Sequence, residues 1–320
     1  MTRLTKSSLF IVAAFGLLNV LWMFFGDFGF VWGDLLNPVI GVLILLSISA
    51  FYSSYRPVED FAVVTLWTAI LIAFSVVAAL SSYLMASLHF SFKDEYMAAF
   101  DNALGFDWVA LLELVGRDAE LGKYATAIYS ASLPLLALTL IFLGLTGRSG
   151  RLELFVSSLI FACFATIALS GPMVAIGPYG HYNIPAELYQ EFAPAVTTQG
   201  EGSLWLSHVM GLREGSYKVL SLADLQGVIT FPSFHTVMSV LMILALRGCG
   251  AIFWISAVLN VLILLTVPLD GNHYFADMVA GGLIAVLVWY ALSRFQRSAS
   301  PNSRRESAQI PVPAMVFGPG

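Results

Sequence analysis

The sequence predicts an all-α, polytopic integral membrane protein with a bundle of about eight transmembrane helices. Hydrophobic residues make up 58% of the 320 positions, charged residues only 11%, and the mean hydropathy is +0.83. A soluble domain normally carries about 25% charged residues. The apolar residues also gather in long runs, and about 20 apolar residues are enough for a helix to cross a bilayer.

Eight apolar runs follow one another along the chain. They cover roughly residues 8–26, 36–54, 61–88, 125–146, 152–171, 229–247, 251–268 and 274–295. No small-residue cleavage site follows the first run, so we expect a retained helix and not a cleaved signal peptide. We divide the chain into N-terminal helices with an outer loop (1–124), a C-terminal bundle (125–297) and a disordered tail (298–320).

The loop at 89–124 is expected to contain two short amphipathic helices. Residues 92–100 and 106–114 both place apolar side chains three to four positions apart, which is typical of helices that lie at a membrane interface. Such helices either shape the entrance to a lipid-facing site or simply cover the outer loops. The sequence leaves both interpretations open.

The distribution of lysine and arginine predicts the orientation. Ten of the 15 basic residues fall on one face of the eight-span arrangement: Arg3, Lys6, Arg56, Arg148, Arg151, Arg247, Arg294, Arg297, Arg304 and Arg305. Basic loops stay on the cytoplasmic side, so we expect a protein of the bacterial inner (cell) membrane with both termini in the cytoplasm. The net charge of −5 argues against a nucleic-acid partner.

Two motifs in the C-terminal bundle carry polar and ionisable groups at membrane depth. The first contains Pro232, Ser233 and His235, and the second contains His273 and Asp277. Two expected spans separate them, so the chain returns to the same membrane face and both histidines lie at one level, facing outward. Ionisable groups at such a depth are costly and usually functional.

The residue types in the two motifs indicate phosphoryl chemistry. His273 and Asp277 are four apart, so on a helix they share one face, and the carboxylate can fix the imidazole tautomer and leave one nitrogen for nucleophilic attack. Ser233 lies where a helix N-terminus favours a phosphate. His235, within one turn, can protonate a departing oxygen.

These motifs resemble the second and third motifs of the type 2 phosphatidic acid phosphatase superfamily, Pro-Ser-Gly-His and Ser-Arg-x5-His-x3-Asp. The separation of 38 residues between His235 and His273 is similar to that of the family, and the resemblance covers about a third of the chain, from about 210 to 295. The bulky Phe234 and the run from His273 to Asp277 bring the chain closer to the inositol phosphorylceramide synthase branch.

The resemblance implies a membrane enzyme that acts on a lipid phosphate through a phosphohistidine and needs no metal or other cofactor. It assigns His273 as the nucleophile, Asp277 as its orienting carboxylate and His235 as acid and then base. Water, an alcohol or a polyol would be the acceptor. The catalytic domain would then be the bundle at 125–297.

The chain departs from the family pattern in its cations. Thr266 and Val267 stand where the family has Ser-Arg. A phosphoryl site needs positive charge or hydrogen-bond donors, and Arg213 and Lys218 are the nearest basic residues on the expected face. We therefore predict them, with Ser233, as phosphate-binding residues, an inference from position and not from a motif.

Less specific interpretations accompany each assignment. Ser233 can serve only as a helix cap, His273 and Asp277 as a structural ion pair, and Arg213 as an ordinary surface arginine. Two histidines and an aspartate can also bind catalytic zinc, but no further ligand has suitable spacing, and we predict no metal. A non-catalytic, lipid-binding or transporting relative that retains the motifs for packing is the alternative function.

Overall fold

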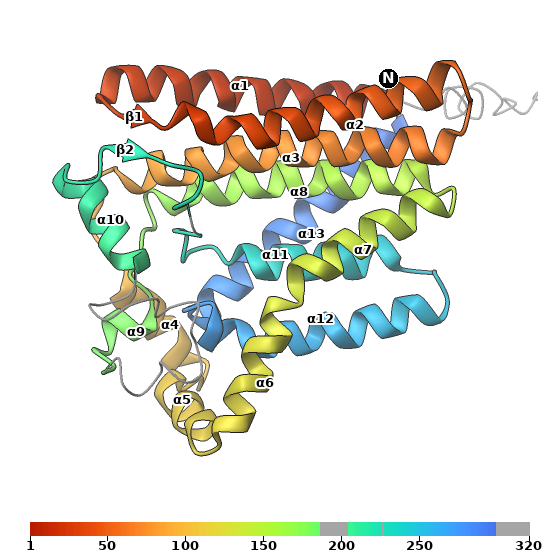
Figure 1. The fold of residues 1–320 in the computed structure, drawn as a ribbon. Helices are drawn as coiled ribbons and strands as arrows, with labels where there is room; N and C mark the ends of the chain where they lie inside the picture. Colours follow the sequence, from red (N-terminus) through yellow and green to blue (C-terminus); the bar gives the residue numbers. More distant parts are fainter. Residues whose placement is uncertain (186–203, 226, 299–320) are drawn as a thin grey trace, which may run out of the picture.

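The computed structural model of the protein describes residues 1–185, 204–225 and 227–298 (Figure 1). Its helices in chain order are α1 (Arg3–Gly26), the 3-10 helix η1 (Trp32–Leu35), α2 (Leu36–Ser54), α3 (Glu59–Ala86), α4 (Asp94–Ala103), α5 (Trp108–Gly116), α6 (Ala119–Ser130), α7 (Ser132–Leu145), α8 (Ser149–Ser170), α9 (Pro178–His181), α10 (Leu204–Glu214), α11 (Phe234–Leu246), α12 (Ala251–Asp270) and α13 (Phe275–Ser298). Two short strands, β1 (Gly29–Phe30) and β2 (Val219–Leu220), pair in parallel. The predicted disordered tail lies outside the described residues except for Ser298.

Within the described residues, seven helical segments are long and apolar enough to cross a membrane. They are Arg3–Gly26, Trp32–Ser54, Glu59–Ala86, Glu120–Leu145, Ser149–Ser170, Ala251–Asp270 and Phe275–Ser298. The described residues contain almost no strand, since β1 and β2 have two residues each. The predicted all-α membrane bundle is therefore confirmed, and the chain is an integral membrane protein.

The sixth expected span is shorter than predicted. The sequence indicated a helix over residues 229–247, but α11 covers only Phe234–Leu246, which is 13 residues. Pro232 has no N–H to donate, and Ser233 has an extended backbone and caps the helix that follows it. Residues 229–233 therefore approach the bundle as irregular chain, and this segment forms part of the candidate site described below.

The expected span at 125–146 consists of two helices. α6 ends at Ser130 and α7 begins at Ser132, so the helical axis breaks near Ala131 (Figure 1). Pro134 explains the break, because its ring excludes the carbonyl of Ser130 from a continuous helix. α6 thereby turns away from α7 and crosses towards the end of α12 (Figure 1).

Helix α8 forms the centre of the bundle. It packs against α1, α3, α7, α11 and α13, and residues such as Phe155, Ile160 and Phe164 belong to the largest apolar core. α2 packs on α3 and otherwise presents an exposed apolar surface, as expected for a helix that faces lipid. The core therefore lies between the N-terminal helices and α11–α13.

The loop at 89–124 forms helices α4 and α5, as the spacing of its apolar residues predicted. α4 packs against α13 and α9, whereas α5 packs against α6. Together with α9 and α10 they gather at one end of the bundle (Figure 1). This end is where α12 finishes, α11 begins and α13 begins, so α4 lies directly against the segments that carry the motifs.

Candidate active site

The two motifs lie side by side where the N-terminus of α11 meets the first turn of α13. Ser233 is the N-cap of α11, and its hydroxyl oxygen accepts a hydrogen bond from Thr236 N at 3.4 Å. Ser233 N donates to the carbonyl of Asp277 at 3.0 Å. Gly281 allows the close approach, because a Cβ at this position would overlap the carbonyl of Ser233.

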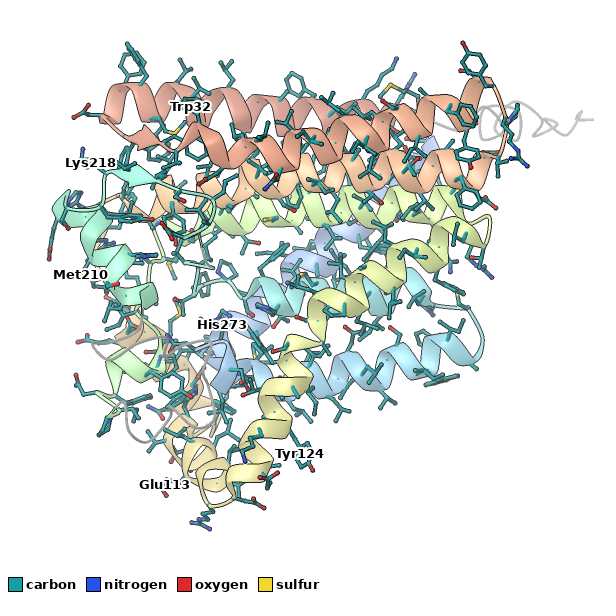
Figure 2. All side chains as sticks on the ribbon, viewed as in Figure 1. Trp32, Glu113, Tyr124, Met210, Lys218 and His273 are labelled. Carbon is teal, nitrogen blue, oxygen red and sulfur yellow. The ribbon has the colours of Figure 1, made fainter. Side chains whose placement is uncertain are left out.

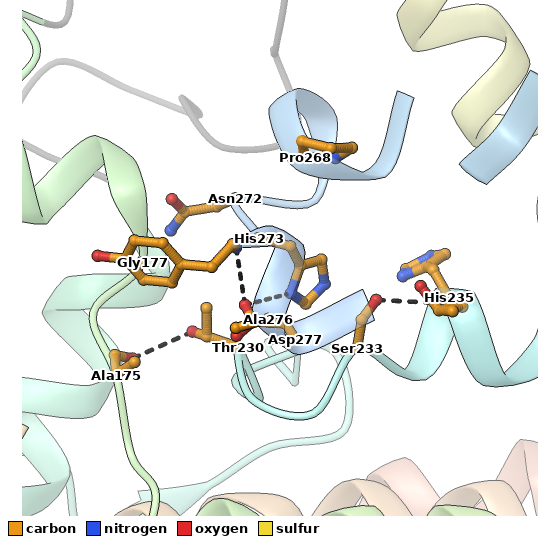
Figure 3. Close-up of polar contacts among 12 residues, drawn as sticks. Ala175, Gly177, Thr230, Ser233, His235, Pro268, Asn272, His273, Ala276 and Asp277 are labelled. Atoms are coloured by element: carbon orange, nitrogen blue, oxygen red, sulfur yellow. Dashed lines mark hydrogen bonds and ion pairs between the residues drawn. The ribbon is translucent and has the colours of Figure 1, made fainter. Parts of the chain in front are cut away.

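His273 and Asp277 form a buried pair at the start of α13. His273 Nδ1 donates to Asp277 Oδ2 at 3.2 Å, and Tyr274 N donates to the same oxygen at 2.9 Å (Figure 3). His273 lies in the turn before α13 and not on the helix itself, so the first helical turn brings the carboxylate back to it. One ring nitrogen is thus engaged, and Nε2 remains as the nitrogen for chemistry.

The surroundings of His273 keep its imidazole neutral. Burial lowers the pKa of His273 to about 4, while a backbone hydrogen bond with Thr230 acts in the opposite direction. Only 3% of the residue is exposed. At neutral pH the ring therefore carries no charge and retains a lone pair, which is the state that a nitrogen nucleophile requires.

Both histidines line one cavity of about 600 Å³. Its polar lining includes Tyr129, Thr230, His235, Asp270, Asn272 and His273, and its apolar lining includes Phe74 and Ala78 of α3 and Ile167 of α8. Figure 3 shows the His273–Asp277 pair on one side of the site and His235 on the other. The cavity thus joins two imidazoles to an apolar wall.

The structure does not bring Arg213 or Lys218 to this cavity. Arg213 donates to the carbonyl of Phe90 at 2.9 Å, and its guanidinium lies 4.3 Å from the centre of the Phe92 ring. Lys218 Nζ donates to the carbonyl of Gly26 at 2.9 Å. Figure 2 shows Lys218 near β2, well separated from His273. The geometry therefore gives no support to their predicted phosphate contacts.

The cavity has no lysine or arginine among its lining residues in the described part of the chain. Its one carboxylate is Asp270, whose Oδ1 accepts a hydrogen bond from Thr126 at 2.6 Å. Positive potential comes instead from the N-terminus of α11, which opens towards the cavity with Phe234 and His235. The site is thus suited to an anion of modest charge.

Sequence reasoning missed the contribution of Asp101 on α4. Its two carboxylate oxygens accept hydrogen bonds from Phe275 N at 2.8 Å and Ala276 N at 2.9 Å. Asp101 thus caps α13 from another helix and satisfies two of the amides that a helix N-terminus leaves free. Burial raises its pKa, whereas these two backbone hydrogen bonds lower it.

Asp94, seven residues earlier on the same helix, holds the other side of the turn. Its carboxylate accepts hydrogen bonds from Gly177 N at 2.8 Å and Ile176 N at 3.0 Å, and Tyr274 donates its hydroxyl at 3.0 Å. Asp94 and Asp101 are both buried. The sequence offered one indication of this role. Asp94 and Asp101 are seven residues, or two helical turns, apart, so both carboxylates lie on one face of an amphipathic helix, the face expected to be buried.

Comparison with known proteins identifies the family. The family model described as PAP2 superfamily matches residues 95–291, which include α4 from Glu95 onward, both motifs and α13 as far as Ala291. No curated protein and no solved structure matches the chain. Members of the superfamily are generally phosphatases and phosphotransferases. Because the match spans more than half of the chain, this protein belongs to the PAP2 superfamily.

Proposed function

We propose that the protein transfers a phosphoryl or phospho-headgroup from a membrane lipid through a phosphohistidine on His273. The observation that carries the proposal is the buried His273–Asp277 pair, whose histidine lines the same cavity as His235. Packing alone would favour apolar side chains here, because burying these polar groups is costly. Retention of all three groups argues for catalysis over a lipid-binding role.

The reaction uses the two imidazoles in sequence. In the first step the lone pair of His273 Nε2 forms a bond to phosphorus, the bond from phosphorus to the leaving oxygen breaks, and His235 gives that oxygen a proton. In the second step the oxygen of water or an alcohol attacks phosphorus and passes its proton to His235. The bond between phosphorus and His273 then breaks and the nucleophile is restored.

The charge of the site favours a phosphodiester donor and an alcohol or polyol acceptor. A phosphate monoester carries more negative charge than a diester, and Val267, fully buried in α12, stands where an arginine would hold it. The apolar lining from α3 and α8 suits acyl chains. These features, with the similarity to the inositol phosphorylceramide synthase branch, support transfer of a headgroup between lipids over hydrolysis.

The proposal is tested with purified protein and labelled phosphatidic acid, phosphatidylinositol and a polyprenyl diphosphate, each with and without added alcohols. We expect an acid-labile phosphoprotein that His273→Ala lacks and that the exposed histidine variant His89→Ala retains. An alcohol-dependent lipid product supports the transferase, whereas free phosphate from the monoester without any adduct indicates a hydrolase. Unchanged donor lipids with no phosphoprotein would instead favour a lipid-binding protein.

A further inference from the structure

The contact between Tyr129 and His235 lies outside both motifs. Tyr129 Oη and His235 Nδ1 are 2.9 Å apart, and the centres of the two rings are 4.3 Å apart. Both residues line the cavity. Because Nδ1 is engaged with the phenol, Nε2 is the nitrogen of His235 that remains for a reacting group.

Helix α6 fixes the position of this phenol. Thr126, three residues before Tyr129 and therefore on the same helix face, donates its hydroxyl to Asp270 at the end of α12. α6 thus makes one polar contact with the helix that precedes His273 and another with the helix that carries His235. The break near Ala131 directs this face of α6 towards the cavity.

We propose that Tyr129 is a positioning residue that holds His235 in its catalytic tautomer, an inference that rests on the proposed function. The phenol oxygen accepts a hydrogen bond from Nδ1–H and so keeps that proton on Nδ1. Nε2 is then the nitrogen that gives a proton to the leaving oxygen and later takes one from the acceptor. Nδ1–H is conserved through both steps, so the contact with Tyr129 need not break.

The two histidines therefore have partners of different chemistry. His273 is paired with the carboxylate of Asp277, and His235 with a neutral phenol. A carboxylate stabilises a positively charged imidazole, as a phosphohistidine requires when phosphorus bonds to Nε2 while Nδ1 keeps its proton. A phenol orients the ring with much less stabilisation of its positive charge, so protonated His235 releases its proton more readily. The structure in this way separates nucleophile from acid.

The test compares Tyr129→Phe with the wild type on two donors that form the same phosphoenzyme. Phosphatidylinositol releases the alkoxide of a diacylglycerol, which needs a proton, whereas the p-nitrophenyl phosphodiester of inositol releases a stable anion that does not. We expect Tyr129→Phe to slow phosphoenzyme formation from phosphatidylinositol at least about tenfold, because general acid catalysis contributes about 10²- to 10⁴-fold. From the p-nitrophenyl phosphodiester the loss should stay below about threefold.

The ratio of the two rates does not depend on the fraction of folded protein, so reduced folding of the variant cannot mimic the result. Tyr124→Phe is the matched control, because Tyr124 lies on the same helix with 64% of its surface exposed, and its ratio should equal that of the wild type. Equal losses on both donors, or no loss on phosphatidylinositol, would overturn the role of Tyr129. Absence of any phosphoenzyme in the wild type with phosphatidylinositol, phosphatidic acid and the polyprenyl diphosphate would overturn the proposed function itself, and this inference with it.

Discussion

The cavity end of the bundle and the corner formed by α10 and β2 use their polar groups in opposite ways. At the cavity, His235 and His273 line the same space, and no lysine or arginine of the described residues lines it with them. At the corner, Arg213 and Lys218 are engaged with backbone carbonyls and lie over the rings of Phe92 and Phe28. The two histidines that we propose as reacting groups and the basic side chains of the corner are thus in separate places.

The difference indicates what the basic residues at the corner do. A guanidinium that donates to a carbonyl and lies over an aromatic ring is stabilised by those contacts and ties neighbouring segments together. Arg213 connects α10 to the chain after α3, and Lys218 connects β2 to the end of α1. The corner therefore connects α10 and β2 to the N-terminal helices, and under the proposed function a phosphate in the cavity would find its donors among helix amides and neutral side chains.

The largest effects should come from the two histidines. We expect His273→Ala to abolish turnover through the phosphoenzyme, because it removes the proposed nucleophile, and His235→Ala to reduce turnover of the lipid donor about 10²- to 10⁴-fold, the contribution of general acid and base catalysis. Single-turnover assays with labelled lipid measure this. Residual phosphoprotein in His273→Ala would show that the nucleophile is another residue and that the contrast between cavity and corner does not concern the reacting groups.

Asp277→Asn should cost roughly 10³- to 10⁴-fold in turnover, the size seen when an orienting aspartate is replaced in other Asp–His pairs. The amide keeps the shape of the side chain but removes the charge that faces His273 Nδ1 at 3.2 Å. If Asp277→Asn binds the lipid as tightly as the His273→Ala variant does, the loss of turnover arises in the chemical step and not in binding. A loss below tenfold would mean that the pair is structural.

Asp101→Ala tests whether α4 belongs to the active site. Removing this cap leaves the amides of Phe275 and Ala276 without their acceptor, which should cost about 1–2 kcal/mol in the free energy of unfolding. We expect turnover to fall about tenfold as well, because α13 carries Asp277. Asp107→Ala removes the exposed cap of α5 and should lower stability without lowering turnover per folded molecule.

The parts of this protein that could be predicted from sequence depend on local spacing. Membrane helices follow from apolar runs, and the His273–Asp277 contact follows from a spacing of four even though His273 precedes the helix. Contacts between distant segments could not be predicted, because they depend on how the helices pack. The cap from Asp101, the phenol of Tyr129 beside His235 and the engagement of Arg213 with Phe90 all belong to this class.

The low pKa of His273, about 4, predicts that phosphoenzyme formation from a p-nitrophenyl phosphodiester, whose leaving group needs no proton from His235, changes less than about threefold between pH 7 and pH 5. An imidazole with an ordinary pKa near 6.5 would lose roughly 25-fold over the same range. The same low pKa affects the free energy of unfolding. Between pH 6.5 and pH 4 the unfolded chain binds a proton at His273 and the folded chain does not, so the contribution of His273 to stability falls as the pH falls. Rapid-quench measurements of the phosphoprotein across this range test the rate.

The smallest effects on turnover are expected for Arg213→Ala and Lys218→Ala, and they bear most directly on the comparison between cavity and corner. Each substitution removes a hydrogen bond to a backbone carbonyl and a contact with an aromatic ring, so each should lower the free energy of unfolding by about 1 kcal/mol. Turnover per folded molecule should change less than about twofold, because neither side chain lines the cavity.

The matched control for both corner substitutions is Lys123→Ala, which removes an exposed ion pair with Glu120 and should leave stability nearly unchanged. Steady-state assays at several lipid concentrations show whether Arg213 and Lys218 stay at the corner during turnover or reach the phosphate in the cavity. A rise of tenfold or more in KM for either corner variant would show that its charge reaches the phosphate, as predicted from sequence. The distance between the cavity histidines and these basic side chains would then exist only in the unliganded protein, and lipid binding would bring the side chain into contact with the phosphate. Unchanged KM and kcat, together with reduced stability, would establish that the helix amides and neutral groups of the cavity hold the phosphate without them.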